Sequence, residues 1–216
     1  WPYMTREGET VPMQLRRDGV KREADVTFGN FARRDDFTDS ILGMDWMTLR
    51  GTADDLYSLT RNPGYLTIKC ADVTSAEKAV IPYIGRRIHH HNYVATTNVT
   101  FAPEHEKQCA GMLLMKDETH QYFLAKTRDE NGNSVVLRKI MENGHEDLAS
   151  KPIADDIHTL NLKVESKGLE LSFSYSADGG KTWEEVASGV DGGFTSTAKA
   201  GGFTGTTIGL YASNSI

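Results

Sequence analysis

The segment Leu169-Glu-Leu-Ser-Phe-Ser-Tyr175 alternates apolar and polar side chains at every position. In the segment Val94-Ala-Thr-Thr-Asn-Val-Thr-Phe101, the same period places Ala95, Thr97, Val99 and Phe101 on one face. A period of two is that of a β-strand, in which successive side chains point to opposite faces of the sheet. Each segment therefore predicts a strand with one face on a core and the other in water or against a second layer.

Short apolar segments separated by turn residues continue this pattern from Asp35 onward. They cover residues 109–115, 120–126, 134–141 and 157–165. Short strands at regular spacing are typical of an all-β protein built as a sandwich. The sequence therefore predicts a two-sheet antiparallel β-sandwich.

Two local signals add detail to the predicted sandwich. The dipeptide Asn131-Gly132 favours a type I′ hairpin turn, because both central positions of that turn need a positive φ. Residues 75–84 form the best helix candidate, and Pro82 would end it. Helices are therefore expected to be minor.

Residues 1–34 differ from the rest of the chain. They are polar, contain two of the six prolines, and show neither helical nor strand periodicity over a useful length. Such a segment is typical of a linker or of a strap that lies on another surface. We therefore expect an irregular linker over residues 1–34 and one domain over residues 35–216.

Composition and charge limit the classes of partner. The 216 residues carry a formal net charge of −6, with acidic and basic residues interspersed and no basic stripe that carries aromatic side chains. This pattern argues against nucleic acid and against an anionic membrane surface. No uncharged run approaches membrane-spanning length. Neutral small molecules and proteins remain as partners.

The two cysteines, Cys70 and Cys109, both lie in apolar, strand-like runs. A buried thiol in such a run behaves as a small hydrophobic group. The spacing leaves a bridge between them open, but it does not form a disulfide framework or a Cys-x-x-Cys site. Cysteine usage therefore assigns no cellular compartment.

The run from Ala200 to Ser213 holds one aromatic residue, Phe203, in a loop rich in glycine that leads into an apolar strand. Glycines on both sides let the backbone adopt a positive φ, so that the ring can project outward. The same pattern is also common in corner residues that fold back onto the core. Both interpretations of Phe203, a partner-facing ring and a corner residue, stay open at this point.

The sequence from Ser176 to Trp183 matches the Asp-box pattern Ser-x-Asp-x-Gly-x-Thr-Trp. In this pattern Asp178 can accept hydrogen bonds from the amides of a turn, and Gly180 supplies an unusual backbone conformation. Trp183 is expected to fold back over the hairpin. A sialidase would carry several copies and an arginine cluster, so we interpret this single copy as a structural hairpin.

Other polar clusters give weaker signals. The run His89-His90-His91 cannot converge on one ion, because neighbours on a strand point to alternate faces, and it is expected to start a partly exposed strand. Asp35 and Asp36 could contribute to a calcium site together with backbone carbonyls, and calcium is the only cofactor that we consider. The chain lacks the phosphate-loop, hydrolase-elbow and zinc-protease motifs, so no residue is assigned as catalytic.

Several segments together resemble one known family. They are Asp35-Asp36-Phe37 with Leu42-Gly-Met-Asp-Trp46, then 57–66, 85–90 and 201–205. In this order they resemble the C-terminal β-sandwich, a concanavalin A-like jelly roll, of glycoside hydrolase family 43 β-xylosidases. The sequence departs from that family after Tyr211, where it reads Ala212-Ser213-Asn214 in place of the family's acidic last strand.

The resemblance implies an accessory role in a xylan-degrading glycosidase of the β-xylosidase or arabinofuranosidase type. Residues 1–34 would be a linker from a missing catalytic propeller, and residues 35–216 would be inactive alone. The loop of Gly202, Phe203 and Thr204 would help to close the substrate pocket of that propeller. The implied partners are the propeller and a xylo-oligosaccharide or arabinoside.

Two alternatives belong to other functional classes. A free-standing carbohydrate-binding module would need a platform of exposed aromatic side chains. The candidates for such a platform are Trp46, Tyr65, Tyr122 and Trp183. A pure interaction domain that forms a homo-oligomer is the second alternative.

Overall fold

The computed structural model describes the backbone of residues 10–17 and 20–27, and residues 34–215 in full. The chain divides after Asp36 into two compact units, and each is described by itself. No helix in the described residues is long and apolar enough to cross a membrane.

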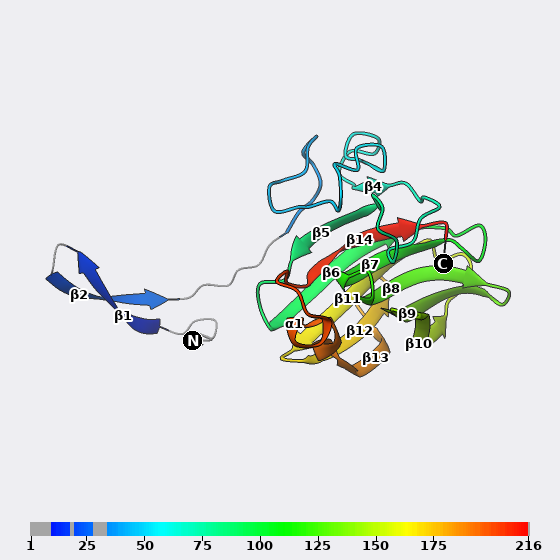
Figure 1. Cartoon of the computed structure of the whole chain (residues 1–216). Coiled ribbons are helices and arrows are strands. Elements are labelled where there is room, and N and C mark those ends of the chain that lie inside the picture. Colours follow the sequence, from blue (N-terminus) through cyan, green and yellow to red (C-terminus); the bar gives the residue numbers. More distant parts are fainter. Residues whose placement is uncertain (1–9, 18–19, 28–33, 216) are drawn as a thin grey trace. The chain divides into compact units, whose positions relative to one another are not determined.

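The first unit contains a β-hairpin (Figure 1). Strand β1 (Thr10–Arg17) pairs with β2 (Val20–Thr27) in antiparallel register. The structure thus differs from the irregular linker expected over residues 1–34. The sequence held a short signal for this hairpin, because Val11, Met13 and Leu15 alternate and an Asp-Gly dipeptide, common in hairpin turns, follows them.

The second unit is a sandwich of two antiparallel sheets (Figure 1). The six-stranded sheet has, in spatial order, β10 (Gly144–Pro152), β9 (Gly132–Met141), β8 (His120–Asp129), β7 (Cys109–Asp117), β14 (Thr207–Ser213) and β5 (Tyr83–Arg87). The four-stranded sheet has β13 (Glu184–Asp191), β12 (Glu170–Ser176), β11 (Thr159–Lys167) and β6 (Asn92–Thr100). The predicted all-β antiparallel sandwich is confirmed.

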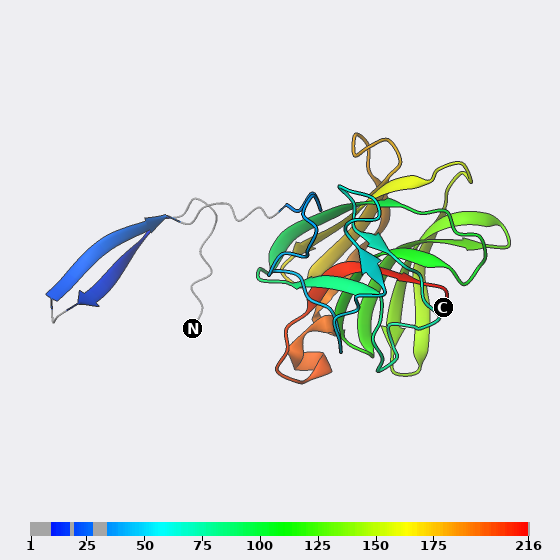
Figure 2. The ribbon, with the colours of Figure 1, turned by 90° about the horizontal axis from the view of Figure 1, so that it is seen from above.

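Short elements complete this unit. They are β3 (Tyr57–Ser58), β4 (Thr67–Ile68), the 3-10 helix η1 (Gly192–Thr195) and the helix α1 (Thr197–Ala200). Figure 2 shows the chain leaving the helical turns and passing through a loop into β14.

The alternating segments account for the core between the two sheets. Leu171 and Phe173 on β12 and Leu162 on β11 are buried. They meet the inward side chains of the six-stranded sheet, where the Tyr122 and Phe173 rings lie 6.0 Å apart. Leu169, which was expected on the same face, is exposed because it precedes the strand.

The six-stranded sheet is buried on its other face as well. Leu113, Phe123 and Tyr211 form a second core cluster on that face. Leu49, Val73 and Ile81, from the segment that precedes β5, pack within or against this cluster. Burial on both faces explains why the sequence of β7 is a continuous apolar run rather than an alternating one.

The helix expected over residues 75–84 is absent. The amide of Thr74 donates to the Glu77 carboxylate at 2.7 Å, which resembles the start of a capped helix, but only a turn follows. Ile81 is instead fully buried in the second core cluster, and β5 begins at Tyr83. Contact with the sheet outweighs the local helical signal here.

The turn between β8 and β9 also differs from the prediction. Asp129 pairs with Gly132, so that the two connecting residues are Glu130 and Asn131. Gly132 has a φ of 121°, whereas Asn131 is not among the residues of positive φ. The hairpin exists, but Asn131-Gly132 does not form the centre of a type I′ turn.

A pair of glycines joins β5 and β14. Gly85 pairs with Gly209, and the Tyr83 ring occupies the space that side chains at these glycines would fill. The Tyr83 hydroxyl donates to Thr207 Oγ1 at 2.8 Å, and burial raises the pKa of Tyr83. Thr207 is the first residue of β14, so this contact fixes the end of the loop that carries Phe203.

Replacing Gly209 with alanine tests this close packing. The new Cβ would lie 2.4 Å from the Ile84 carbonyl oxygen and 2.5 Å from Gly85 Cα. We expect Gly209→Ala to lower the free energy of unfolding by about 3 kcal/mol, because the backbone must move apart. Urea unfolding measures this loss.

Gly205→Ala is the matched control, because a Cβ at Gly205 meets no atom within 4 Å. Its expected cost is below about 0.5 kcal/mol. Equal losses for the two variants would contradict the packing described.

Candidate functional site

Phe203 lies on the loop between α1 and β14. The amide of Gly201 donates to the Thr197 carbonyl at 2.9 Å, and Gly201, with a φ of 71°, ends α1. Gly202 follows with a φ of 68°. Two successive residues in this conformation turn the chain away from the sheet. The Phe203 side chain is fully exposed and does not fold back onto the core.

The C-terminal half of this loop is fixed to the sandwich. Thr206 donates from its hydroxyl to the Thr195 carbonyl at 2.7 Å, and the Ile88 amide donates to the Thr206 carbonyl at 3.1 Å. Lys116, on β7, donates from its ammonium group to the carbonyl of Thr204. An exposed ring is therefore carried by an anchored backbone.

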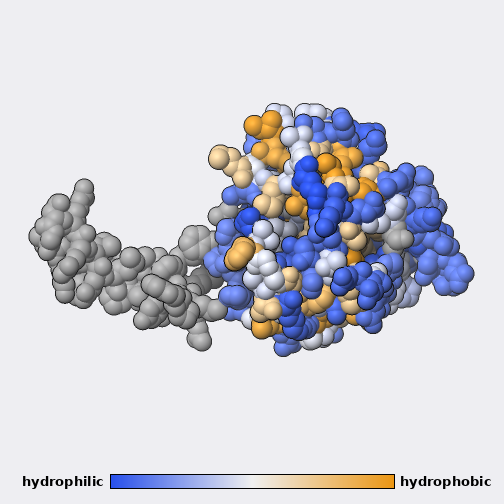
Figure 3. Space-filling view, in the orientation of Figure 1, coloured by the Kyte–Doolittle hydropathy of each residue, from blue (hydrophilic) through white to orange (hydrophobic). Residues whose placement is uncertain are grey.

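The edge strand β5 holds a second exposed apolar surface. Met47 and Gly85 exchange backbone hydrogen bonds of 2.8 and 2.9 Å, which ties the preceding segment to β5. The Arg86 guanidinium lies 3.9 Å from the centre of the Trp46 ring. Ile41 and Met44, in the same segment, are exposed. In the space-filling view, apolar residues are exposed over the loops at the top (Figure 3).

The Asp-box residues lie apart in sequence and sheet from this loop, at the turn between β12 and β13. The Asp178 carboxylate accepts hydrogen bonds from the Thr182 hydroxyl at 2.6 Å and from the Thr182 and Lys181 amides at 3.0 Å. Ser176 donates to it at 2.7 Å. The bonds from Thr182, and then that from Ser176, hold the pKa of Asp178 well below its ordinary value.

Gly180 and Trp183 complete this hairpin. Gly180 has a φ of 87°, and a Cβ there would lie 3.2 Å from Asn161 Nδ2 and 3.7 Å from the Trp183 ring. The Lys163 ammonium lies 4.4 Å from the centre of the Trp183 ring. This geometry is that of a structural clasp, with no group placed to attack a bond.

Asp35 and Asp36, the residues predicted to contribute to a calcium site, lie at the end of the first unit. Asp36 accepts a hydrogen bond from Arg34 Nε at 2.7 Å. Within the residues that the structure describes, no group of three or more His, Cys, Asp or Glu side chains is arranged to hold a metal ion. Calcium at Asp35 and Asp36 stays a prediction.

The cysteines are both free thiols, so the open question of a bridge is answered for this structure. Cys109 is buried on β7, and burial raises the pKa of its thiol to about 12. Such a thiol is a poor nucleophile at neutral pH. Cys109 thus acts as a core residue, whereas Cys70 is only partly buried.

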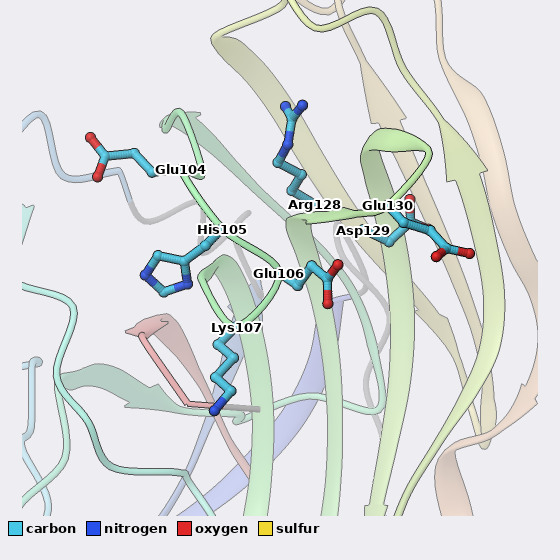
Figure 4. A pocket seen from close by; sticks show the side chains of 7 residues that line it. All are labelled: Glu104, His105, Glu106, Lys107, Arg128, Asp129 and Glu130. Carbon is cyan, nitrogen blue, oxygen red and sulfur yellow. The ribbon is translucent and has the colours of Figure 1, made fainter.

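Two hollows lie on the surface of the second unit. The first, of about 480 Å³, lies between the 104–107 loop and the hairpin after β8. Its charged side chains, among them Glu104, Lys107 and Arg128, point in different directions (Figure 4). The second, of about 340 Å³, has an apolar floor that includes Phe123 and Ile140. The lining of the first hollow is ionisable throughout, and that of the second mixes apolar and polar side chains.

The aromatic side chains proposed for a carbohydrate platform do not form one. Tyr122 is only 2% exposed and belongs to the main core. Trp46 and Trp183 are each covered by a cationic side chain. Of the four candidates, Tyr65 alone counts as exposed, and one exposed ring is not a platform.

The family model of the beta xylosidase C-terminal concanavalin A-like domain (GH43_C2) matches residues 34–215, which include both sheets and the Phe203 loop. The chain belongs to this family. The resemblance inferred from sequence motifs is therefore confirmed.

Relatives of this GH43 C-terminal domain are longer proteins. A non-reducing-end alpha-L-arabinofuranosidase of Bacteroides ovatus is 30% identical over 180 residues, which is 83% of this chain and 33% of the relative. A xylosidase/arabinosidase of Butyrivibrio fibrisolvens is 26% identical over 178 residues, which is 82% of this chain and 34% of the relative. The chain thus spans about a third of the length of these relatives.

Solved structures agree with the fold of this GH43 domain. The GH43 BlXynB protein of Bacillus licheniformis superposes with a TM-score of 0.79 at 25% identity, over 91% of this chain and 39% of that chain. The Bacteroides ovatus xyloglucan PUL GH43B protein gives a TM-score of 0.78 at 27% identity, over 92% and 40%. This chain is therefore an accessory domain of the GH43 xylosidase and arabinosidase type.

The pH dependence of stability tests the hydrogen bonds of Asp178. Its pKa is lowered by folding from an ordinary value of 3.8, so its contribution is present above that value and is lost as the pH falls. We expect Asp178→Ala to lower Tm at neutral pH, and the difference from wild type to shrink between about pH 5 and about pH 2.

Thermal melts across this pH range provide the measurement. Asp156→Ala, at an exposed acid in the turn between β10 and β11, is the control and should change Tm little. A constant difference between Asp178→Ala and wild type at all pH values would contradict the account.

Proposed function

We propose that this domain supports a GH43 catalytic propeller in the same protein and helps to close its substrate pocket with Phe203. The observation that carries the proposal is a fully exposed phenylalanine on a backbone fixed at Lys116 and Thr206. The substrate class is a short xylo-oligosaccharide or an arabinoside. The names and the family of the relatives support this class.

Physical reasoning favours a partner surface for the Phe203 ring. Burying an aromatic side chain against a partner is worth about 1.5 to 3 kcal/mol, so an exposed ring on an anchored loop has much to gain from contact. A fixed loop also loses little conformational entropy on binding. Substrate pockets are commonly lined by such aromatic side chains together with a few polar groups.

The chemical groups of glycoside cleavage are expected elsewhere in the protein. The reaction needs an acid that protonates the leaving oxygen and a carboxylate on the opposite side of the sugar. In the described residues, the acids near the Phe203 loop are engaged locally, as in the pairs of Asp117 with His120 and Asp191 with Lys199. The role of Phe203 would be to complete the pocket wall and exclude water.

A second apolar surface supports packing against the propeller. Ile41 and Met44 are exposed in the segment that is tied to β5. Strand β5 pairs with β14, which follows the Phe203 loop. We propose that this edge of the sandwich faces the catalytic domain. Self-association through the same edge is the alternative, and light scattering of the isolated domain distinguishes the two.

Substituting Phe203 in the protein that includes the catalytic domain tests the proposed role. We expect Phe203→Ala to lower kcat/KM for an aryl pentoside by a factor of about 10 to 100, the loss of one buried aromatic contact. Steady-state kinetics give the measurement, and urea unfolding should show an unchanged fold.

Leu148→Ala is the matched control, since Leu148 is a partly exposed apolar residue on β10, at the opposite edge of the six-stranded sheet from β5. Its kinetics should equal those of wild type. If Phe203→Ala behaves like Leu148→Ala, the pocket role is rejected.

A further inference from the structure

Lys116 is a charged residue inside a strand that is otherwise buried and largely apolar. Its residue exposure is 8%, and the preceding residues of β7, Cys109–Met115, are all buried. A buried ammonium group is costly unless it is well hydrogen-bonded. The hydrogen-bond partners of the Lys116 ammonium group therefore indicate its structural role.

A β-bulge displaces Lys116 from the regular hydrogen-bonding pattern between β7 and β8. Met115 pairs with Gln121 on β8 and Asp117 pairs with His120, so the register shifts by one residue at Lys116. Such a bulge leaves the extra residue unpaired and redirects its side chain. On the other side of β7, Met115 pairs with Thr207, the first residue of β14. The bulge thus lies beside the loop that precedes β14.

The ammonium group of Lys116 meets this loop next to Phe203. It donates to the carbonyl of Thr204 and lies 3.5 Å from the Thr204 hydroxyl. It is also near the backbone of Gly202, where a Cβ would lie 3.9 Å from Nζ. In the described part of the chain, both hydrogen-bond acceptors of Lys116 belong to Thr204, and no ion pair involves it.

The loop needs such a contact because its sequence is flexible. Three of the five residues 201–205 are glycine, and glycine loses more conformational freedom on ordering than any other residue. A hydrogen bond from a charged donor is roughly twice as strong as one between neutral groups. One buried ammonium can therefore hold the tip of the loop while the Phe203 ring stays exposed.

We propose that Lys116 is a positioning residue, which holds the Phe203 loop in the conformation that closes the substrate pocket. This inference rests on the proposed function of Phe203. Lys116 touches no substrate in this arrangement and acts only through the Thr204 backbone.

Hydrogen exchange on this chain tests the structural half of the inference without the catalytic domain. Lys116→Met keeps the length of the apolar stem and removes the donors. We expect the amides of residues 201–206 to exchange at least about tenfold faster, while those in the centre of β7 and β8 are unchanged. Equal exchange of the loop in both proteins would overturn the proposal.

Lys126→Met is a matched control in the neighbouring strand. Lys126 is also buried, and its ammonium donates to the Phe101 carbonyl at 2.7 Å and to the Ile157 carbonyl. The Lys126→Met substitution thus removes a buried lysine whose hydrogen bonds hold other loops. Faster exchange of residues 201–206 in Lys126→Met would mean that general loosening, rather than the Lys116 contact, governs the loop, and would also overturn the proposal.

A double-mutant cycle in the protein that includes the catalytic domain tests the functional half. Lys116→Met should lower kcat/KM for an aryl pentoside by about five- to tenfold, mainly through KM, and should have less than about a twofold effect in the Phe203→Ala background. A Lys116→Met effect that persists without Phe203, or no effect while Phe203→Ala has one, contradicts the positioning role.

The two proposals fail in distinguishable ways. If Phe203→Ala leaves the kinetics unchanged, the proposed pocket role is rejected, while the exchange data still decide whether Lys116 orders the loop. If Lys116→Met does not fold, Lys116→Arg keeps a cationic donor in a different shape. In Lys116→Arg, the amides of residues 201–206 should exchange more slowly than those of a loop without this hydrogen bond. Exchange as fast as that of an unbonded loop would overturn the inference.

Discussion

The placement of β14 between β5 and β7, in a sheet that is buried on both faces, is the constraint on which the rest of the structure depends. A strand with neighbours on both sides and core on both faces cannot shift without breaking many contacts at once. The Gly85 and Gly209 pair, covered by the Tyr83 ring, allows the two strands to approach at the end where the loop arrives. The loop that carries Phe203 therefore starts from a fixed point.

In this arrangement, the described domain provides a rigid scaffold, and the proposed catalytic domain carries the reacting groups. The Asp178 hairpin, the buried lysines and the pair of Gly85 and Gly209 all stabilise local structure. In the proposed function, the domain contributes to a reaction through what it presents to a partner. Its exposed apolar features include the Phe203 ring and the segment tied to β5. The proposed support of a GH43 propeller uses both.

Much of the sandwich could be predicted from the sequence, because alternation over 94–101 and 169–175 directly reflects burial on one face. The signals that failed were local ones. The pattern over 75–84 predicted a helix, but the burial of Ile81 against the sheet is incompatible with it. The alternation over 11–15 in the first unit was too short, among many polar residues, to predict its hairpin. The sequence allowed Phe203 to be either exposed or folded onto the core. The role of Lys116 could not be predicted, because it depends on a β-bulge and on a contact with a residue 88 positions away.

The most direct test of the central claim is a crystal structure of the protein that includes the catalytic domain, with a pentose bound in its active site. The account predicts that the Phe203 ring forms part of the pocket wall, in contact with the bound sugar, and that Thr204 keeps its bond to Lys116. A structure in which residues 201–205 face solvent, away from the sugar, would contradict it.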